Sequence, residues 1–201
     1  MKFEKVPVYT TLDTYDRLRN DRGCNYEFKT ALRLIEIVPE VAFELPGTPV
    51  VKVTPIPVAH GSVEGAVIFV FQVDDKKVVF GWDIDVPDAK LPKDGGRKEP
   101  RTNAQVFENH SQLLLEPDVY FVPANTWNAT GTGHTSFEAA RHYIRAVRAK
   151  RGTYLLHMSG HEDGSNNPGF GWTDQDWETH AQLDKEVENV RVAKQGMILS
   201  L

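Results

Sequence analysis

Short apolar runs separated by polar turns recur along the chain and predict strands that alternate with helices. The most apolar run, 66–73 (AVIFVFQV), predicts a buried strand, and a polar turn returns the chain through a second strand at 78–82. The runs 119–122 and 153–158 have the continuous apolar character of strands that are buried on both faces. Prolines at alternate positions of 50–58 exclude a helix and favour an extended strand with incomplete ladder pairing.

Helical periodicity is clearest in the segment that follows His134. Phe137, Ala140, Ile144 and Val147 recur at helical spacing and form one apolar stripe. Thr135 and Glu138 fit a capping box at the start of this helix, and Gly152 is expected to end it. Two further helices are predicted over 103–115 and 173–187.

The N-terminal part of the chain is less regular. Residues 5–10 predict a strand, and Thr11 or Asp13 is suited to cap a helix that runs through Leu18. Residues 26–35 fit either a helix or a strand. A last strand is expected at 190–193. We find no internal repeat, and this order of elements predicts a single α/β domain over residues 1–201.

Composition narrows the classes of protein that the chain can represent. A length of 201 residues suffices for one domain with a substantial core, and a net charge of −5 argues against a general nucleic-acid-binding surface. The single Cys24 excludes an intrachain disulfide and a thiolate zinc cluster. The sequence has neither a membrane-spanning apolar run nor a signal-peptide pattern, so a cytoplasmic protein that does not enter membranes is expected.

Side chains that are able to bind a metal lie at the ends of three predicted strands. His60, Asp83 and His157 each follow an apolar run directly, and His134 precedes the helix between two of these strands. In α/β proteins, sites collect at the carboxyl ends of strands. Imidazole and carboxylate groups are ligands suited to zinc, manganese or iron. Each residue alone is more typical of an ordinary structural role, but the shared placement indicates a metal site.

Other residues remain open as alternatives. Asp85 replaces Asp83 as the carboxylate ligand if the strand ends later. The loop residues His161, Glu162 and Asp163 are suited either to contact substrate or to remain as an exposed polar loop. Ordinary roles on predicted helices are expected for His110, His142 and His180, and the four tryptophans fit either a pocket for a ring-bearing substrate or the core (Trp82, Trp127, Trp172 and Trp177). No Gly-x-Ser-x-Gly elbow, P-loop or dinucleotide-binding glycine pattern is present.

Several motifs, taken in order, resemble the metallo-β-lactamase superfamily, and most closely the phosphodiesterases related to tRNase Z and to the cyclic phosphodiesterase of phosphonate breakdown. Segments 53–61 (VTPIPVAHG) and 78–83 (VVFGWD) are similar to the strands that carry a metal-binding histidine and the metal-bridging aspartate. Segments 133–136 (GHTS) and 155–159 (LLHMS) are similar to those that carry an additional catalytic histidine and the final metal-binding histidine. The closing segment 192–197 resembles the hairpin of the family.

The resemblance implies an αββα sandwich and a hydrolase that uses a metal-activated water on a phosphodiester or another small-molecule substrate. It assigns His60, Asp83 and His157 to zinc, or to manganese or iron, and it assigns His134 to catalysis. The His-x-His-x-Asp-His signature of the family has no counterpart here, since no two histidines are separated by one residue and none precedes His60. We therefore expect the C-terminal portion of the fold, incomplete at the N-terminus.

Two functional classes follow from this departure. The first is the metal-dependent hydrolase, and the second is a catalytically inactive remnant with a structural or interaction role, in which metal is absent or partially bound. An incomplete sandwich also leaves the apolar residues of 66–73 uncovered, and such surfaces favour self-association. We therefore expect the chain to form a homo-oligomer.

Overall fold

The structure, a computed structural model, describes residues 5–20, 31–92, 94–128, 134–158 and 168–201. Its strands are β1 (Val6–Thr10), β2 (Leu32–Glu36), β3 (Phe43–Leu45), β4 (Val51–Pro57), β5 (Val67–Val73), β6 (Lys76–Phe80), β7 (Val119–Pro123), β8 (Gly152–Leu156) and β9 (Val190–Val192). Its helices are α1 (Leu12–Asn20), α3 (Asn103–Asn109), α4 (Ser111–Leu114), α5 (Phe137–Val147) and α6 (Asp174–Leu183). The α/β class predicted from the sequence is confirmed.

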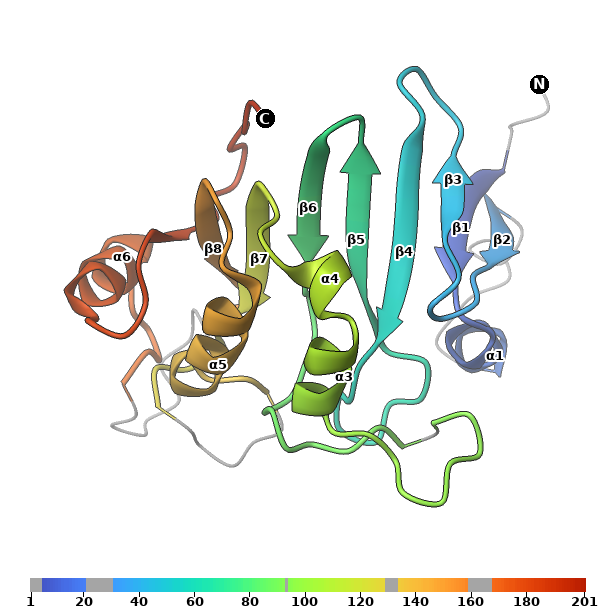
Figure 1. Cartoon of the computed structure of the whole chain (residues 1–201), viewed down its shortest axis with the longest axis horizontal. Helices are drawn as coiled ribbons and strands as arrows, with labels where there is room; N and C mark the ends of the chain where they lie inside the picture. Colours follow the sequence, from blue (N-terminus) through green and yellow to red (C-terminus); the bar gives the residue numbers. More distant parts are fainter. Residues whose placement is uncertain (1–4, 21–30, 93, 129–133, 159–167) are drawn as a thin grey trace.

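One sheet of seven strands organises the molecule, in the spatial order β3-β4-β5-β6-β7-β8-β9. Pairing is antiparallel from β3 to β6 and parallel from β6 to β9. Because β4 and β6 are both antiparallel to β5, the carboxyl ends of β4, β6, β7 and β8 meet at one edge of the sheet. This edge is the lower one in Figure 1. Residues that follow these strands therefore lie near one another in the structure although they are far apart in the sequence.

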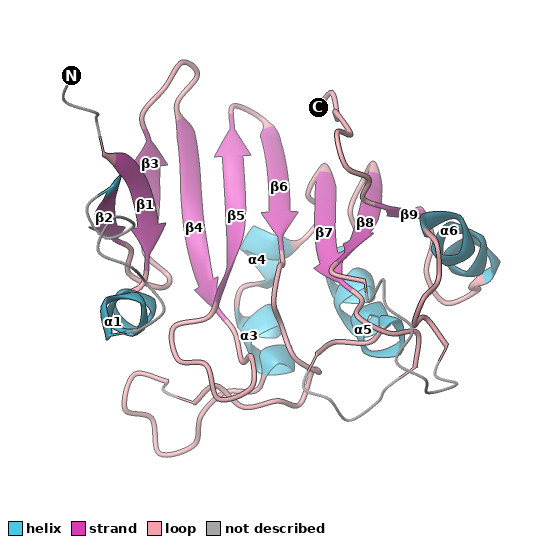
Figure 2. Cartoon of the chain, turned by 180° about the vertical axis from the view of Figure 1, so that it is seen from behind, coloured by secondary structure: helices cyan, strands magenta, loops and turns pink. Residues whose placement is uncertain are grey.

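Helices α3, α4 and α5 pack on one face of this sheet, as Figures 1 and 2 show from opposite sides. Alternate side chains of the central strands point into this layer, as expected for a pleated sheet. Ile68, Val70, Val79 and Val122 are fully buried there, and Tyr143 of α5 is likewise buried. The main core of the molecule lies between the sheet and these helices.

The other face of the sheet is aromatic and is not covered by a helix among the described residues, as the view in Figure 2 shows. Ring contacts run across it from Phe69–Phe71, with centroids 6.0 Å apart, to Phe80–Phe121 at 5.2 Å and Phe121–Tyr154 at 5.6 Å. Most of these rings are only half-buried. We refer to these five residues, Phe69, Phe71, Phe80, Phe121 and Tyr154, as the aromatic face.

The N-terminal strand β1 forms a separate two-stranded parallel sheet with β2. Of the segment 26–35, which fits either a helix or a strand in sequence, the described residues from 32 onward form a strand. Residues 21–30 lie outside the described part of the chain. The ring of Tyr9 stacks on Phe43 of β3 with centroids 5.1 Å apart. The Thr11 hydroxyl donates to the carbonyl of Gly65 at 3.0 Å, which ties β1 to the loop after β4.

Several predicted boundaries are corrected by the structure. Ser136, and not Thr135, caps α5, because the Ser136 hydroxyl accepts from the amide of Ala139 while the Thr135 hydroxyl donates to the carbonyl of Ile84. The same helix ends at Arg148 in the left-handed conformation, before Gly152 is reached. The segment 103–115 forms two short helices joined at His110. Within the described part of the chain, no helix is long and apolar enough to cross a membrane.

Candidate metal centre

Four elements deliver the predicted site residues to the same edge of the sheet. His60 follows β4, Asp83 follows β6, and His157 is the first residue after β8. His134 precedes the N-cap of α5, on the loop that leaves β7. His157 has a φ of 61°, a left-handed conformation that turns the chain sharply where the strand ends. The strand directions alone explain why these residues converge.

The donor atoms of three of these side chains form a compact group. One ligand atom each from His60, Asp83 and His134 lies within 4.8 Å of the others. The ring centroids of His60 and His134 are 5.4 Å apart, and those of His134 and His157 are 5.2 Å apart. His157 Nδ1 lies 2.8 Å from Asp83 Oδ1. Asp83 therefore lies close to all three histidines. His134, which the resemblance assigns to catalysis, belongs to the compact group of donor atoms.

The buried polar atoms of this group fit a bound cation. Asp83 Oδ1 and His157 Nδ1 are buried atoms of half-exposed side chains, and they face each other at 2.8 Å with no other hydrogen-bond partner among the described residues. Burying polar atoms is costly unless a hydrogen bond or an ion compensates them. Zinc ligands at about 2.0–2.2 Å in tetrahedral geometry lie roughly 3.3–3.6 Å apart, so ligand atoms up to 4.8 Å apart would have to approach by as much as about 1.5 Å to share one ion. The residues present fit a divalent metal.

A buried layer of hydrogen bonds supports His60. Asp85 Oδ1 lies 3.3 Å from His60 Nδ1, and the other carboxylate oxygen of Asp85 accepts from the amide of Gly61. The amide of Ala59 donates to Asn103 Oδ1 at 2.7 Å, while Asn103 Nδ2 donates to the carbonyls of Ala59 and Asp85. The Tyr143 hydroxyl donates to the Asp85 carbonyl at 2.5 Å, and burial raises the pKa of this phenol. The loops that carry His60 and Asp83 are thereby joined.

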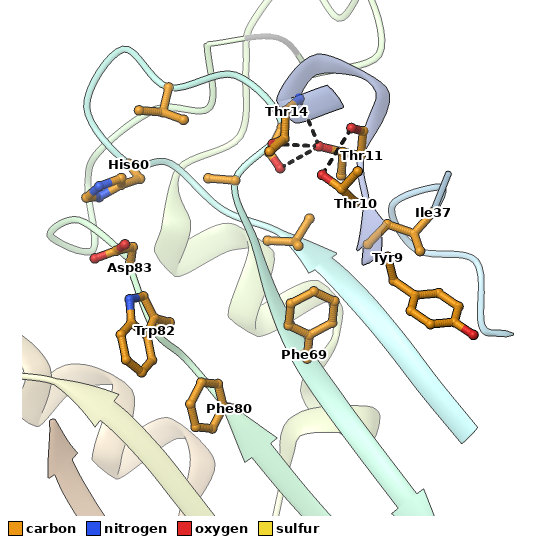
Figure 3. Close-up of a pocket in the computed structure, with 14 residues that line it drawn as sticks. Tyr9, Thr10, Thr11, Thr14, Ile37, His60, Phe69, Phe80, Trp82 and Asp83 are labelled. Carbon is orange, nitrogen blue, oxygen red and sulfur yellow. Dashed lines mark hydrogen bonds between the residues drawn. The ribbon is translucent and has the colours of Figure 1, made fainter. Parts of the chain in front are cut away.

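A pocket of about 400 Å³ opens beside His60 and Asp83. Figure 3 shows these two side chains at one end, with Trp82 and Phe80 below them. Its opposite wall contains threonine hydroxyls and apolar side chains (Tyr9, Thr10, Thr11, Thr14 and Ile37). Trp82 is 52% exposed, which agrees with the alternative that this tryptophan lines a pocket. The pocket has the volume of a small-molecule site.

The remaining candidates lie away from this group or outside the described residues. Trp177 is buried in the core, and Trp127 and Trp172 pack against its ring. His110 joins α3 to α4, while His142 and His180 lie on α5 and α6, as predicted. His161, Glu162 and Asp163 lie outside the described part of the chain, as does Cys24.

Asn103 and Tyr143 are the supporting residues that the sequence did not reveal. Both lie within predicted helices, and their side chains hydrogen-bond to the backbone of Ala59 and Asp85 in the site loops. A polar residue such as Asn103 is common at the start of a helix, so the sequence gives no sign of a special role. Asn103 supports the site because its side chain hydrogen-bonds the backbone of Ala59 in the folded chain. Asp85, the alternative carboxylate ligand, contacts His60 and Gly61 with its two carboxylate oxygens.

The comparisons with known proteins agree with this architecture. No curated protein sequence matches the chain. Among solved structures, a diphosphatase from the PhnP family is 19% identical, with a TM-score of 0.56 over 96% of this chain and 57% of that one. The metallo-β-lactamase fold protein YhfI from Bacillus subtilis is 16% identical, with a TM-score of 0.59 over 96% and 64%. Zn²⁺-bound PqqB from Methylobacterium extorquens is 14% identical, with a TM-score of 0.61 over 100% and 64%.

The chain thus spans 57–64% of the length of these three structures, and at such identities the likeness concerns the fold. A family model described as "Beta-lactamase superfamily domain" matches residues 1–158, which is more than half of the chain. This match includes the strand ends that carry His60, Asp83 and His157, in the order expected from the sequence. The chain therefore belongs to the metallo-β-lactamase superfamily.

Proposed function

We propose that this chain is a metal-dependent hydrolase that acts on a phosphodiester. The observation that carries the proposal is the contact of Asp83 with His157, two half-exposed side chains whose facing atoms are buried at 2.8 Å from each other with no other hydrogen-bond partner among the described residues, beside two further histidines. Proteins of this fold generally bind metal ions, and the fold neighbours include a diphosphatase. When bound, the metal lowers the pKa of a water to give a hydroxide nucleophile and polarises the oxygen of the scissile group.

Each residue has a distinct role in this proposal. His60, Asp83 and His157 would hold the metal, which we take to be zinc, with manganese or iron as alternatives for the same donor set. His157 is included because its Nδ1 lies 2.8 Å from Asp83 Oδ1, while the ligand atoms that lie within 4.8 Å of one another are those of His60, Asp83 and His134. His134 donates a proton to the leaving oxygen, or hydrogen-bonds it. Its exposed position on the loop before α5 suits contact with a substrate.

The pocket beside His60 and Asp83 supports a small-molecule substrate. The half of the substrate that does not react would lie against Trp82 and Phe80, whose rings stack with centroids 5.7 Å apart. Proteins use such aromatic walls to hold apolar or ring-bearing groups. The net charge of −5 gives no support to a general nucleic-acid surface.

A second candidate is a non-catalytic protein with a structural or interaction role. It is favoured by one feature of the sequence, the absence of any His-x-His pair that would supply further metal ligands. Under both candidates we propose that residues 1–201 act as one domain of the metallo-β-lactamase type, and that it self-associates.

Metal content distinguishes the two candidates. We expect near-stoichiometric metal, measured by elemental mass spectrometry, in the wild type and in His142→Ala, which removes an exposed histidine on α5. His60→Ala and Asp83→Ala should lose most of the metal, together with hydrolysis of bis(p-nitrophenyl) phosphate. A folded wild type that contains no metal, and is unchanged by these substitutions, would exclude the hydrolase in favour of the non-catalytic role.

A further inference from the structure

Asp85 contacts Nδ1 of His60, which leaves Nε2 as the ring nitrogen that could bind a metal. Asp85 Oδ1 lies 3.3 Å from His60 Nδ1, and the carboxylate is almost fully buried, with a side-chain exposure of 9%. An ionised carboxylate accepts hydrogen bonds and cannot donate them. With an ionised Asp85, a hydrogen bond at this contact requires the proton on Nδ1 of His60 and leaves Nε2 of a neutral imidazole with a free lone pair. The contact with Asp85 therefore favours the Nδ1–H tautomer of His60.

The position of the Asp85 carboxylate is itself fixed by the backbone. Its second oxygen accepts from the amide of Gly61, so both oxygens are engaged. The Asp85 amide donates to the carbonyl of Ala59 at 2.9 Å, and the Asp85 carbonyl accepts from Tyr143 and Asn103. Because these contacts immobilise Asp85 on both sides, the imidazole of His60 is held in one orientation.

We propose that Asp85 is a positioning residue that fixes the Nδ1–H tautomer of His60 and so directs its Nε2 to a divalent metal. The inference rests on the function proposed above and deepens it, since it adds a residue that acts through a ligand without contacting the metal. Partners of this kind orient ligating histidines and raise their basicity, and their loss typically lowers metal affinity by about 10- to 100-fold.

The substitution Asp85→Asn tests the proposal because an amide has only one oxygen. If this oxygen keeps the hydrogen bond from Gly61, the amide nitrogen faces His60 Nδ1 and donates to it. The proton of the imidazole then moves to Nε2, which can no longer bind a metal without first losing that proton. The shape of the side chain is retained, so packing around Tyr143 and Asn103 is preserved.

The first measurement is the tautomer of His60 in the metal-free protein, read from imidazole ¹⁵N chemical shifts and assigned with a His60→Gln variant. We expect the Nδ1–H form in the wild type and the Nε2–H form in Asp85→Asn. The second measurement is Zn²⁺ affinity by competition with a chelator, which we expect to fall by about 10- to 100-fold in Asp85→Asn.

Asp118→Asn is the matched control. Asp118 is also a buried aspartate that accepts from a backbone amide, that of Lys77 at 2.9 Å, but it lies at the start of β7 and at the opposite edge of the sheet. We expect this variant to lose stability comparably while the His60 tautomer and the Zn²⁺ affinity stay unchanged.

The outcomes separate this inference from the function on which it rests. A wild type that shows the Nδ1–H tautomer but binds no Zn²⁺ contradicts the metal-dependent function and the metal part of the inference, while the tautomer control by Asp85 stands. A wild type that binds Zn²⁺ with an affinity and a tautomer that Asp85→Asn leaves unchanged overturns the positioning role alone.

Discussion

Gly65 shows how a single backbone position supports the site. It has a φ of 77°, and a Cβ atom built on it would lie 2.4 Å from Thr11 Oγ1. We expect Gly65→Ala to lower the free energy of unfolding by about 2–4 kcal/mol, because it adds left-handed strain to a steric clash. The Thr11–Gly65 hydrogen bond would also be lost. Chemical denaturation of the purified variant measures the change.

Gly196 provides the control for this substitution. Its φ is 76°, nearly the same, but a Cβ atom there meets nothing within 4 Å. Gly196→Ala should therefore lower the free energy of unfolding by about 1 kcal/mol, the backbone contribution alone. Equal losses in the two variants would show that the contact between β1 and the loop after β4 contributes nothing to stability.

At the scale of single residues, a local pattern indicates the candidate ligands but not their surroundings. The sequence singles out His60, Asp83 and His157 because each directly follows an apolar strand, and their role as ligands stays a prediction. The contacts of Asp85 and Asn103 depend on two loops that meet only in the folded chain. Which residue lies next to a ligand is a long-range property, and no local pattern indicates it.

At the scale of elements, an ion-pair network holds the segment between β6 and α3 to the rest of the molecule. Arg101 contacts Asp94 at 2.7 Å within this segment and Glu40 at 2.7 Å before β3. Hydrogen bonds from Arg101 lower the pKa of the buried Asp94 carboxyl despite its burial. The network therefore joins an irregular segment of the chain to the loop between β2 and β3.

Acid should weaken this attachment. A carboxyl group whose pKa is lowered in the folded state adds stability above its unfolded pKa of about 3.9, and that contribution is lost as the pH falls through the folded pKa. Asp94→Asn should cost about 2–3 kcal/mol near neutral pH, because Arg101 loses its buried partner but keeps Glu40. Below pH 4 we expect the difference between variant and wild type to shrink, as measured by denaturation at several pH values.

The control for Asp94 is an exposed ion pair. Asp75 lies 3.4 Å from Lys76 and its side chain is 83% exposed, so Asp75→Asn should change stability little at any pH. A stability difference for Asp94→Asn that stays constant between pH 3 and pH 7 would contradict the role of its ionised form.

Some of the predicted helices and strands depend only on neighbouring residues in the sequence, and others depend on contacts with distant residues. The sequence predicts a helix over 173–187, and α6 starts at this place because Thr173 and Asp176 form a capping box within one helical turn, although the helix already ends at Leu183. The cap of α5 was misassigned to Thr135, because that hydroxyl is engaged by the distant Ile84. The strand β2 remained ambiguous from the sequence, and its pairing with β1 decides its conformation.

At the scale of the whole molecule, the apolar pattern does not predict the order and direction of the strands in the sheet. These two properties bring the candidate site residues to one edge of the sheet. The pattern predicted that 66–73 and 78–82 form a hairpin, and β5 and β6 pair in this way with boundaries shifted by one or two residues. The family resemblance, with its missing N-terminal strands, predicts apolar surface left uncovered on 66–73. The half-buried rings of Phe69 and Phe71 agree with that expectation among the described residues.

The aromatic face should make the molecule bind hydrophobic probes and self-associate. Contiguous exposed apolar surface favours association, and four half-buried rings of this face, Phe69, Phe71, Phe80 and Phe121, lie next to one another, while Tyr154 is buried. We expect an increase in 8-anilinonaphthalene-1-sulfonate fluorescence on addition of the native protein, and a sedimentation coefficient that rises with protein concentration.

Phe71→Lys places a charge within this face and should reduce both signals while the far-ultraviolet circular dichroism stays unchanged. Leu183→Lys is the matched control, because Leu183 is a solitary residue at the end of α6 with 71% exposure, and its substitution should leave dye binding and sedimentation as in the wild type. A wild type that sediments as a monomer at every concentration and does not enhance the dye would show that the rings of the aromatic face are shielded in solution. The expected homo-oligomer would then lack its physical basis, because burial of this face is the driving force on which self-association depends.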